Sequence, residues 1–135
     1  MSYDISNIEG IGPAFAKQLS VAGIVKTEDL LNHCGTAKGR KQVAETTGLS
    51  EKQLLKWTNM ADLMRISGVG EEYSELLEAA GVDTVKELQH RVAENLAAKM
   101  AEVNATKKLV RMVPAKSMVE RWIEQAKTLK PMISH

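Results

Sequence analysis

The sequence predicts an all-α protein in which two similar halves stack into one compact unit. Apolar residues recur at positions i, i+3, i+7 and i+10 in two segments, which is the spacing of one face of a helix. Glycines follow the apolar runs where helices would end, and no alternating run of β-branched residues indicates a strand. The third observation is that one pattern of residues occurs twice along the chain.

The first half is expected to open with a helical hairpin. Pro13 directly after Gly12 marks a helix start, because proline suits the first helical position, where the amide needs no intrahelical partner. Gly23 is expected to end this helix, since a residue without a Cβ readily adopts a left-handed cap. The second half repeats the turn with Glu71 in the place of the proline.

Three further helices are expected in each half. Thr27 and Thr84 are expected as N-caps of short helices over residues 28–33 and 85–91, and these are followed by helices near 38–46 and 95–103. Ser50 with Gln53 fits a capping box that opens a long helix reaching about Arg65. The last helix of the second half carries Trp122, as this long helix carries Trp57.

The repeat is regular over most of the chain. At an offset of 58, one set of residues matches a second set: Gly10, Gly12, Phe15, Leu19, Ala22 and Gly23 against Gly68, Gly70, Tyr73, Leu77, Ala80 and Gly81. At an offset of 65, Leu54, Trp57, Ala61 and Met64 match Val119, Trp122, Ala126 and Leu129. Because the two tryptophans share one apolar stripe, both are expected to be buried.

The repeat divides the chain into residues 1–65 and 66–135, without a linker. The segment "NMADLMRISGVG" runs from the first long helix directly into the second turn, with no stretch rich in proline or serine. The helix at about 51–65 is therefore expected to close the first half and to open the second. One continuous stack is favoured over two independent domains.

Composition and charge exclude several classes of protein. The apolar runs are too short to span a bilayer, and the single cysteine, Cys34, allows no intrachain disulfide, so an intracellular, cytoplasmic location is expected. The net charge is +1, but residues 71–94 are acidic and residues 95–135 are basic. Such asymmetry marks a partner surface in some proteins and a solvated face in others.

The two turns resemble the helix-hairpin-helix motif. "IEGIGPAFAKQL" and "ISGVGEEYSELL" both carry its apolar-x-Gly-apolar-Gly core, and over its full length the chain resembles a tandem helix-hairpin-helix family catalogued as domain-of-unknown-function family 4332. The resemblance implies a SAM-like helical fold. It implies no established function.

The first turn is the candidate nucleic-acid contact. Two glycines expose backbone amides at the positive end of a helix, where they can hold a phosphate oxygen without reading a base. The candidate residues are Gly10, Ile11, Gly12, Ala14 and Lys17. A secondary basic surface is expected from Lys38, Arg40, Lys41, Lys107, Lys108 and Arg111.

The second turn is expected to be structural. Its residues Gly68, Val69 and Gly70 precede glutamates at 71, 72 and 75, whose charge stabilises a helix N-terminus and repels a phosphate. A Lys or Arg usually follows the Gly-Pro of DNA-binding copies, whereas this chain has Ala14. Gly-apolar-Gly also serves simply to turn two helices tightly.

No catalytic site, metal site or cofactor site is expected. The sequence identifies no base that would activate Cys34 as a nucleophile. Its neighbour His33 lacks the spaced Cys or His partners that a metal site needs. We therefore expect a non-enzymatic binding module with no small-molecule substrate and no membrane partner. The leading hypothesis is sequence-nonspecific DNA binding, and the alternative is a protein-protein adaptor whose partner the sequence does not name.

Overall fold

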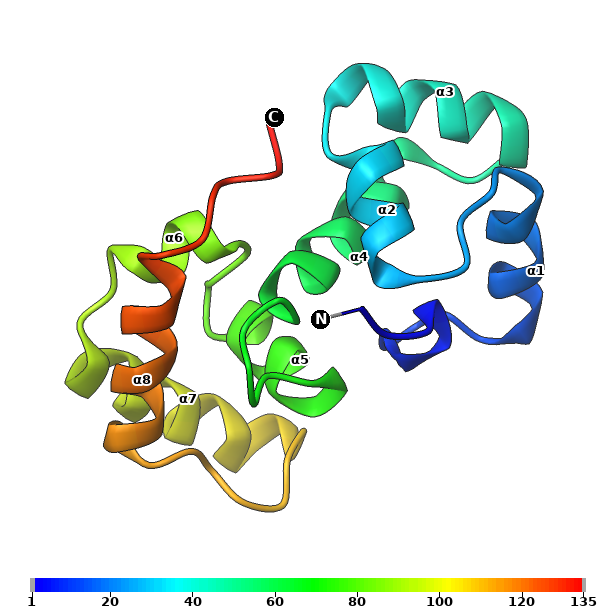
Figure 1. Ribbon diagram of the computed structural model, residues 1–135. Helices are drawn as coiled ribbons and strands as arrows, with labels where there is room; N and C mark the ends of the chain where they lie inside the picture. Colours follow the sequence, from blue (N-terminus) through cyan, green and yellow to red (C-terminus); the bar gives the residue numbers. More distant parts are fainter. Residues whose placement is uncertain (1, 135) are drawn as a thin grey trace.

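The computed structural model describes residues 2–134, and this part of the chain is helical, with no strand (Figure 1). None of the described helices combines the length and the apolar composition that a bilayer-spanning helix needs. A short 3-10 helix comes first and eight α-helices follow: η1 (Ile5–Asn7), α1 (Pro13–Val21), α2 (Thr27–Cys34), α3 (Ala37–Thr47), α4 (Glu51–Leu63), α5 (Glu71–Ala79), α6 (Val85–Gln89), α7 (Ala93–Lys107) and α8 (Lys116–Ala126).

Helix α4 belongs to both halves of the core. Leu54, Trp57 and Met60 are buried in a cluster with residues of η1 and α1–α3, whereas Leu63 at the end of α4 is buried in a second cluster with residues of α5–α8. In Figure 1, α4 runs from the α2–α3 group toward the α5–α6 group. The expected all-α fold class is confirmed, and the two clusters meet along this one helix.

The two turns have the same backbone hydrogen bonds. In the first, Ile8 N donates to Ile5 O at 3.0 Å and Ile11 N donates to Ile8 O at 3.1 Å. In the second, the bonds at the same offset of 58 are Ile66 N to Leu63 O at 3.1 Å and Val69 N to Ile66 O at 3.0 Å. All of these side chains are buried. The sequence repeat is therefore also a repeat of backbone geometry.

The first glycine of each turn lies against a tryptophan. Gly10 has φ +94°, and a Cβ there would stand 3.4 Å from Nε1 of Trp57; Gly68 has φ +91° and the same distance to Nε1 of Trp122. Phe15 lies 5.2 Å from Trp57 between ring centroids, and Tyr73 lies 5.2 Å from Trp122. The expected burial of both tryptophans is confirmed, at 3% and 4% exposure.

The expected caps are confirmed, except that Thr27 is not an N-cap and only one bond of the capping box expected at Ser50 is present. Gly48 ends α3 with φ 79°, and the side chain of Ser50 accepts from Gln53 N at the start of α4. Thr84 caps α6 as expected, by accepting from Glu87 N. Thr27 instead is the first residue of α2, and its hydroxyl accepts from Tyr3 N at 3.0 Å, so the N-terminal segment uses the oxygen that a cap would need.

The C-terminal tail returns from α8 to the first half. Residues 131–134 run in Figure 1 from the end of α8 toward α2 and α3. Ser134 N donates to Gly35 O at 2.8 Å, and Arg40 Nη2 donates to Ser134 O at 2.8 Å. This tail therefore connects the last element of the second half to the junction of α2 and α3.

Candidate functional site

The first turn presents an open helix N-terminus. Gly12 is the N-cap of α1, with φ −85°, and nothing lies within 4 Å of the position that a Cβ would take there. Its carbonyl accepts the first helical bond, from Ala16 N at 2.9 Å. Gly12, Ala14 and Lys17 are exposed, and the first amides of an α-helix have no partner within the helix.

Ile11 does not contribute a free amide. Its N–H donates to Ile8 O at 3.1 Å, and the side chain is 4% exposed. The equivalent amide of Val69 donates to Ile66 O at 3.0 Å. The expectation that the amide of Ile11 is available to a phosphate is therefore wrong, because the tight turn uses this amide internally.

Arg40 does not belong to a basic surface. The side chain is 4% exposed and donates to the carbonyls of Cys34 at 3.0 Å, Gly35 at 3.3 Å and Ser134 at 2.8 Å. The expectation that Arg40 faces a nucleic acid is wrong, because the C-terminal tail and the α2–α3 junction surround its guanidinium. A planar group with five donors suits this role of joining several carbonyls.

The remaining basic residues do not form one surface. Lys38 and Lys41 are exposed on α3, and Lys107, Lys108 and Arg111 are exposed at and after the end of α7. Helices α3 and α7 lie at opposite ends of the view in Figure 1. Lys107 lines one cavity with Glu9, so it lies nearer to the first turn than the view alone indicates.

Acidic residues gather against the first turn as well as the second. Burial raises the pKa of Glu71, and a hydrogen bond with Glu9 raises it further. Burial likewise raises the pKa of Glu75, followed by repulsion from Glu9 and Glu78. Since Glu9 directly precedes Gly10, the negative charge of α5 lies beside the turn that is the candidate phosphate contact.

A cavity opens where the second turn meets α8. It has a volume of about 360 Å³ and is lined by what we call the turn-2 face: Ser67, Gly68, Met118, Arg121, Trp122 and Gln125. Gln125 Oε1 accepts from Ser67 N at 2.6 Å, which fixes the turn to the helix. Arg121 is exposed at the mouth.

The same face of the first half is partly covered. At the repeat offsets, its residues are Glu9, Gly10, Gln53, Lys56, Trp57 and Met60, which we call the turn-1 face. Glu9, Lys56 and Met60 share a smaller cavity, of about 170 Å³, with Glu75, Glu78 and Ala79 of α5. Helix α5 therefore covers Met60, which is 1% exposed, whereas its counterpart Gln125 is half-buried and no second helix of the described residues lines the cavity beside α8.

The turn-2 face does not follow from the sequence pattern. The repeat makes Trp122 the counterpart of Trp57, but it does not say that one copy is covered and the other is not. The sequence gives one indication of this face. A basic residue directly precedes the tryptophan in both helices, Lys56 in the first half and Arg121 in the second.

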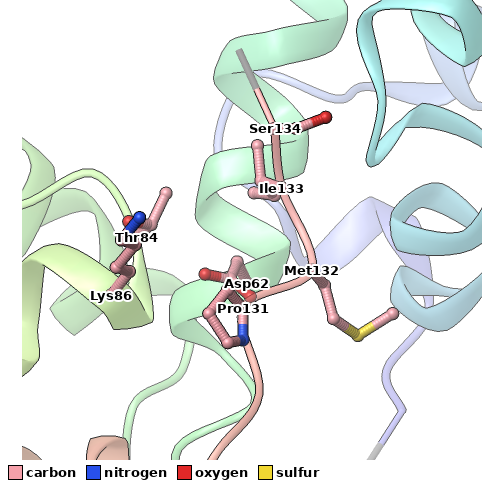
Figure 2. A pocket seen from close by; sticks show the side chains of 7 residues that line it. All are labelled: Asp62, Thr84, Lys86, Pro131, Met132, Ile133 and Ser134. Carbon is pink, nitrogen blue, oxygen red and sulfur yellow. The ribbon is translucent and has the colours of Figure 1, made fainter.

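A further cavity, of about 290 Å³, lies beside the C-terminal tail, between α4 and α6 (Figure 2). Asp62, at 1% exposure, forms an ion pair with Arg65 at 2.7 Å and accepts from Val85 N at 2.8 Å. Arg65 also donates to Lys130 O at 2.9 Å. Asp62 thus has its partners within the fold, where it ties α4 to α6 and, through Arg65, to the tail.

Cys34 is held as a neutral thiol. The side chain is fully buried, and burial raises its pKa to about 11. A thiol with a raised pKa is a poor nucleophile, because the thiolate is the reactive form. Within residues 2–134, no group of three or more His, Cys, Asp or Glu side chains is placed to hold a metal ion.

Comparison with known proteins identifies one family. The family model described as "Domain of unknown function (DUF4332)" matches residues 9–129, which include both turns and both tryptophan helices. No curated protein and no solved structure matches the chain.

Proposed function

The chain belongs to the family of the domain of unknown function DUF4332, and on this premise we propose that it is a non-enzymatic helix-hairpin-helix module that binds a helix of a partner protein. Three observations support the proposal. The two turns share one backbone geometry, the turn-2 face is accessible, and the buried side chains that could do chemistry are engaged within the fold or held neutral. Asp62, Arg40 and Cys34 are each committed to internal contacts or to a neutral state.

The motif assignment is supported by the repeat of the turn geometry. Each turn has a glycine with φ above +90°, then an apolar residue that bonds back by three positions, then a glycine as helix N-cap. Each following helix ends in the same way: Ile24 N bonds Leu19 O at 3.1 Å, and Val82 N bonds Leu77 O at 2.9 Å.

One observation carries the functional proposal. Helix α5 contributes to the cavity beside Lys56 and Met60 of the turn-1 face, whereas the cavity at the turn-2 face is lined, within residues 2–134, by the turn and α8 alone. In repeat proteins each unit covers its neighbour, and the terminal faces are either polar caps or binding surfaces. Half-buried Met118 and exposed Gly68 lie over the buried Trp122 in the turn-2 face, and the flexible methionine offers an adaptable contact to an incoming helix.

Site-specific photo-crosslinking tests this proposal. A photoreactive residue is placed at Met118 in the turn-2 face and, as the control, at exposed Val92 in the α6–α7 connection. We expect a protein adduct in cells from position 118 and not from position 92. The adduct partner, once identified and purified, should bind the wild-type chain in calorimetry. Equal adducts at both positions, or no binding by the purified partner, would refute the proposal.

Nonspecific DNA binding is the second candidate function. It is favoured by the exposed amides of Gly12 and Ala14 with Lys17 about one helical turn on. It is opposed by Glu9 and by the acidic start of α5 beside the same turn. Fluorescence anisotropy with duplex and single-stranded DNA at two salt concentrations decides, since phosphate contacts weaken as salt rises.

Lys17→Glu and Glu72→Lys sharpen the DNA test. If the first turn holds DNA, Lys17→Glu should weaken binding and reduce the salt slope by about one unit, and Glu72→Lys should strengthen binding. If the wild type shows no affinity at low salt, the DNA candidate fails. If it binds and Lys17→Glu changes nothing, the contact lies elsewhere, with Lys107, Lys108 and Arg111 as the next variants.

A further inference from the structure

We propose that the turn-2 face receives an acidic helix, whose two carboxylates one turn apart engage Arg121. This inference rests on the proposed function and adds the chemistry of the partner. The template for this proposed contact lies within the chain itself, where α5 packs beside the turn-1 face.

The internal contact brings acids to a base. Glu75, Glu78 and Ala79 of α5 share a cavity wall with Lys56 and Met60 of α4. Lys56 attracts both carboxylates, although burial keeps the pKa of each above its ordinary value. A glutamate pair spaced i, i+3 therefore lies beside two bases, Lys56 and Lys107, and Lys56 is the one at the position of Arg121.

The turn-2 face has a base at the equivalent position, with less negative charge around it. Arg121 occupies the place of Lys56, and its guanidinium can hold a carboxylate through two parallel hydrogen bonds. Ser67 occupies the place of Glu9, so the acid that repels Glu71 and Glu75 at the turn-1 face is missing. An acidic helix meets less repulsion here than α5 meets on its own site.

Arg121 is also free to accept a partner. The neighbouring acids of α8 have other bases: Glu120 pairs with Lys116 at 3.8 Å and Glu124 with Lys127 at 3.1 Å. Within residues 2–134, Arg121 takes part in no ion pair. The side chain is exposed and borders a cavity whose lining contains no carboxylate.

A second copy of the chain is a poor occupant. By the repeat, α1 is the helix that would take the place of α5, with Lys17 and Ser20 at the positions of Glu75 and Glu78. Lys17 would then face Arg121, and like charges in contact oppose association. The charge pattern selects an acidic helix of another protein over self-assembly.

Helix α5 itself supplies the probe. The peptide is residues 69–82, N-acetylated and C-amidated, with a hydrocarbon staple between positions 73 and 77, because short helices are marginal in water. At 100° per residue these positions lie opposite Glu75. The control peptide carries Glu75→Gln and Glu78→Gln. Each is titrated into the ¹⁵N-labelled full chain, and the two indole N–H signals report the two faces separately.

We expect the acidic peptide to shift the Trp122 indole and the amides of Ser67 and Gly68, and to leave the Trp57 indole unchanged. The variant Arg121→Glu replaces the proposed partner of the peptide carboxylates by a residue of the opposite charge. It should weaken peptide binding by about tenfold or more. The control variant Lys41→Glu, with the same change of charge on α3, should bind within about twofold, because it lies far from the site.

Three results would overturn this inference: no shift at the turn-2 face at millimolar peptide, equal binding of the control peptide, or binding unchanged by Arg121→Glu. Failure of the proposed function is a separate result. If a purified partner crosslinks at position 118 while the acidic peptide fails, the binding face stands and the acidic-helix inference falls. If both fail, the turn-2 face is a polar end cap.

Discussion

Gly10 lies against the indole of Trp57, 3.4 Å from Nε1 to the position that a Cβ would take, and the glycine has φ +94°. The turn can therefore pack directly against the long helix because Gly10 has no side chain. The same relationship holds between Gly68 and Trp122. Gly12, only two residues away, has an ordinary φ and open space around it.

We predict that Gly10→Ala costs about 1–3 kcal/mol of stability, because an alanine is strained at this positive φ and its Cβ would lie in contact with Trp57. The matched change Gly12→Ala should cost less than about 1 kcal/mol. Urea unfolding of both variants measures the difference. If the two changes cost the same, the close packing of glycine on tryptophan does not define the turn.

We predict that Arg40→Met destabilises the chain by at least about 2 kcal/mol, because buried carbonyls then lose their donor. Lys41→Met, exposed on the same helix, should change stability by less than about 0.5 kcal/mol. Truncation after Lys130 should reduce the cost of Arg40→Met, because Ser134 is then absent. A double-mutant cycle by urea unfolding checks this coupling. Strict additivity would show that Arg40 does not hold the tail.

We predict that stability falls as the pH rises from about 9 to about 11, in part through Cys34. The folded thiol has a raised pKa, so in this range the unfolded chain loses a proton that the folded chain keeps. The stabilisation is fully present below pH 9 and is lost as pH rises toward the folded value. Cys34→Ala should show a shallower fall in urea unfolding. An identical slope in both chains would contradict the burial of the thiol.

We predict that Glu9→Gln lowers the pKa of Glu71 and leaves it somewhat above its ordinary value, because burial is the largest cause of the rise and Glu9 the next. A raised carboxyl pKa favours the folded state at low pH, and that contribution is lost as the pH rises through the folded pKa. Carboxyl carbon NMR measures the titration. Glu45→Gln, exposed on α3, is the control and should leave Glu71 unchanged.

Much of the fold follows from local signals in the sequence. Gly48 and Ser50 mark helix ends through their own conformation and side-chain oxygen, and the tryptophans follow from an apolar stripe. These signals depend on residues within one or two turns of each other. The all-α class and the repeat are therefore predictable from the amino-acid sequence alone.

Most of the features that the sequence did not predict depend on contacts between distant segments. Arg40 is buried by a tail that lies 94 residues later, and Thr27 is used by Tyr3, 24 residues earlier. The amide of Ile11 is used inside a turn whose tightness a Gly-apolar-Gly pattern does not specify. The open turn-2 face depends on where α5 lies, which no spacing rule determines. The candidate site is therefore less predictable than the fold.

The most direct test of this account compares two equivalent positions, Met60 and Gln125, by thiol labelling. In a Cys34→Ala background, each is changed to cysteine and the labelling rate is measured under native conditions. We predict rapid labelling at position 125, slowed by the stapled α5 peptide, and protection at position 60, where the native side chain is 1% exposed beside α5. Equal rates at both positions, with no effect of the peptide, would contradict the claim that the turn-2 face is the open counterpart of the one that α5 covers.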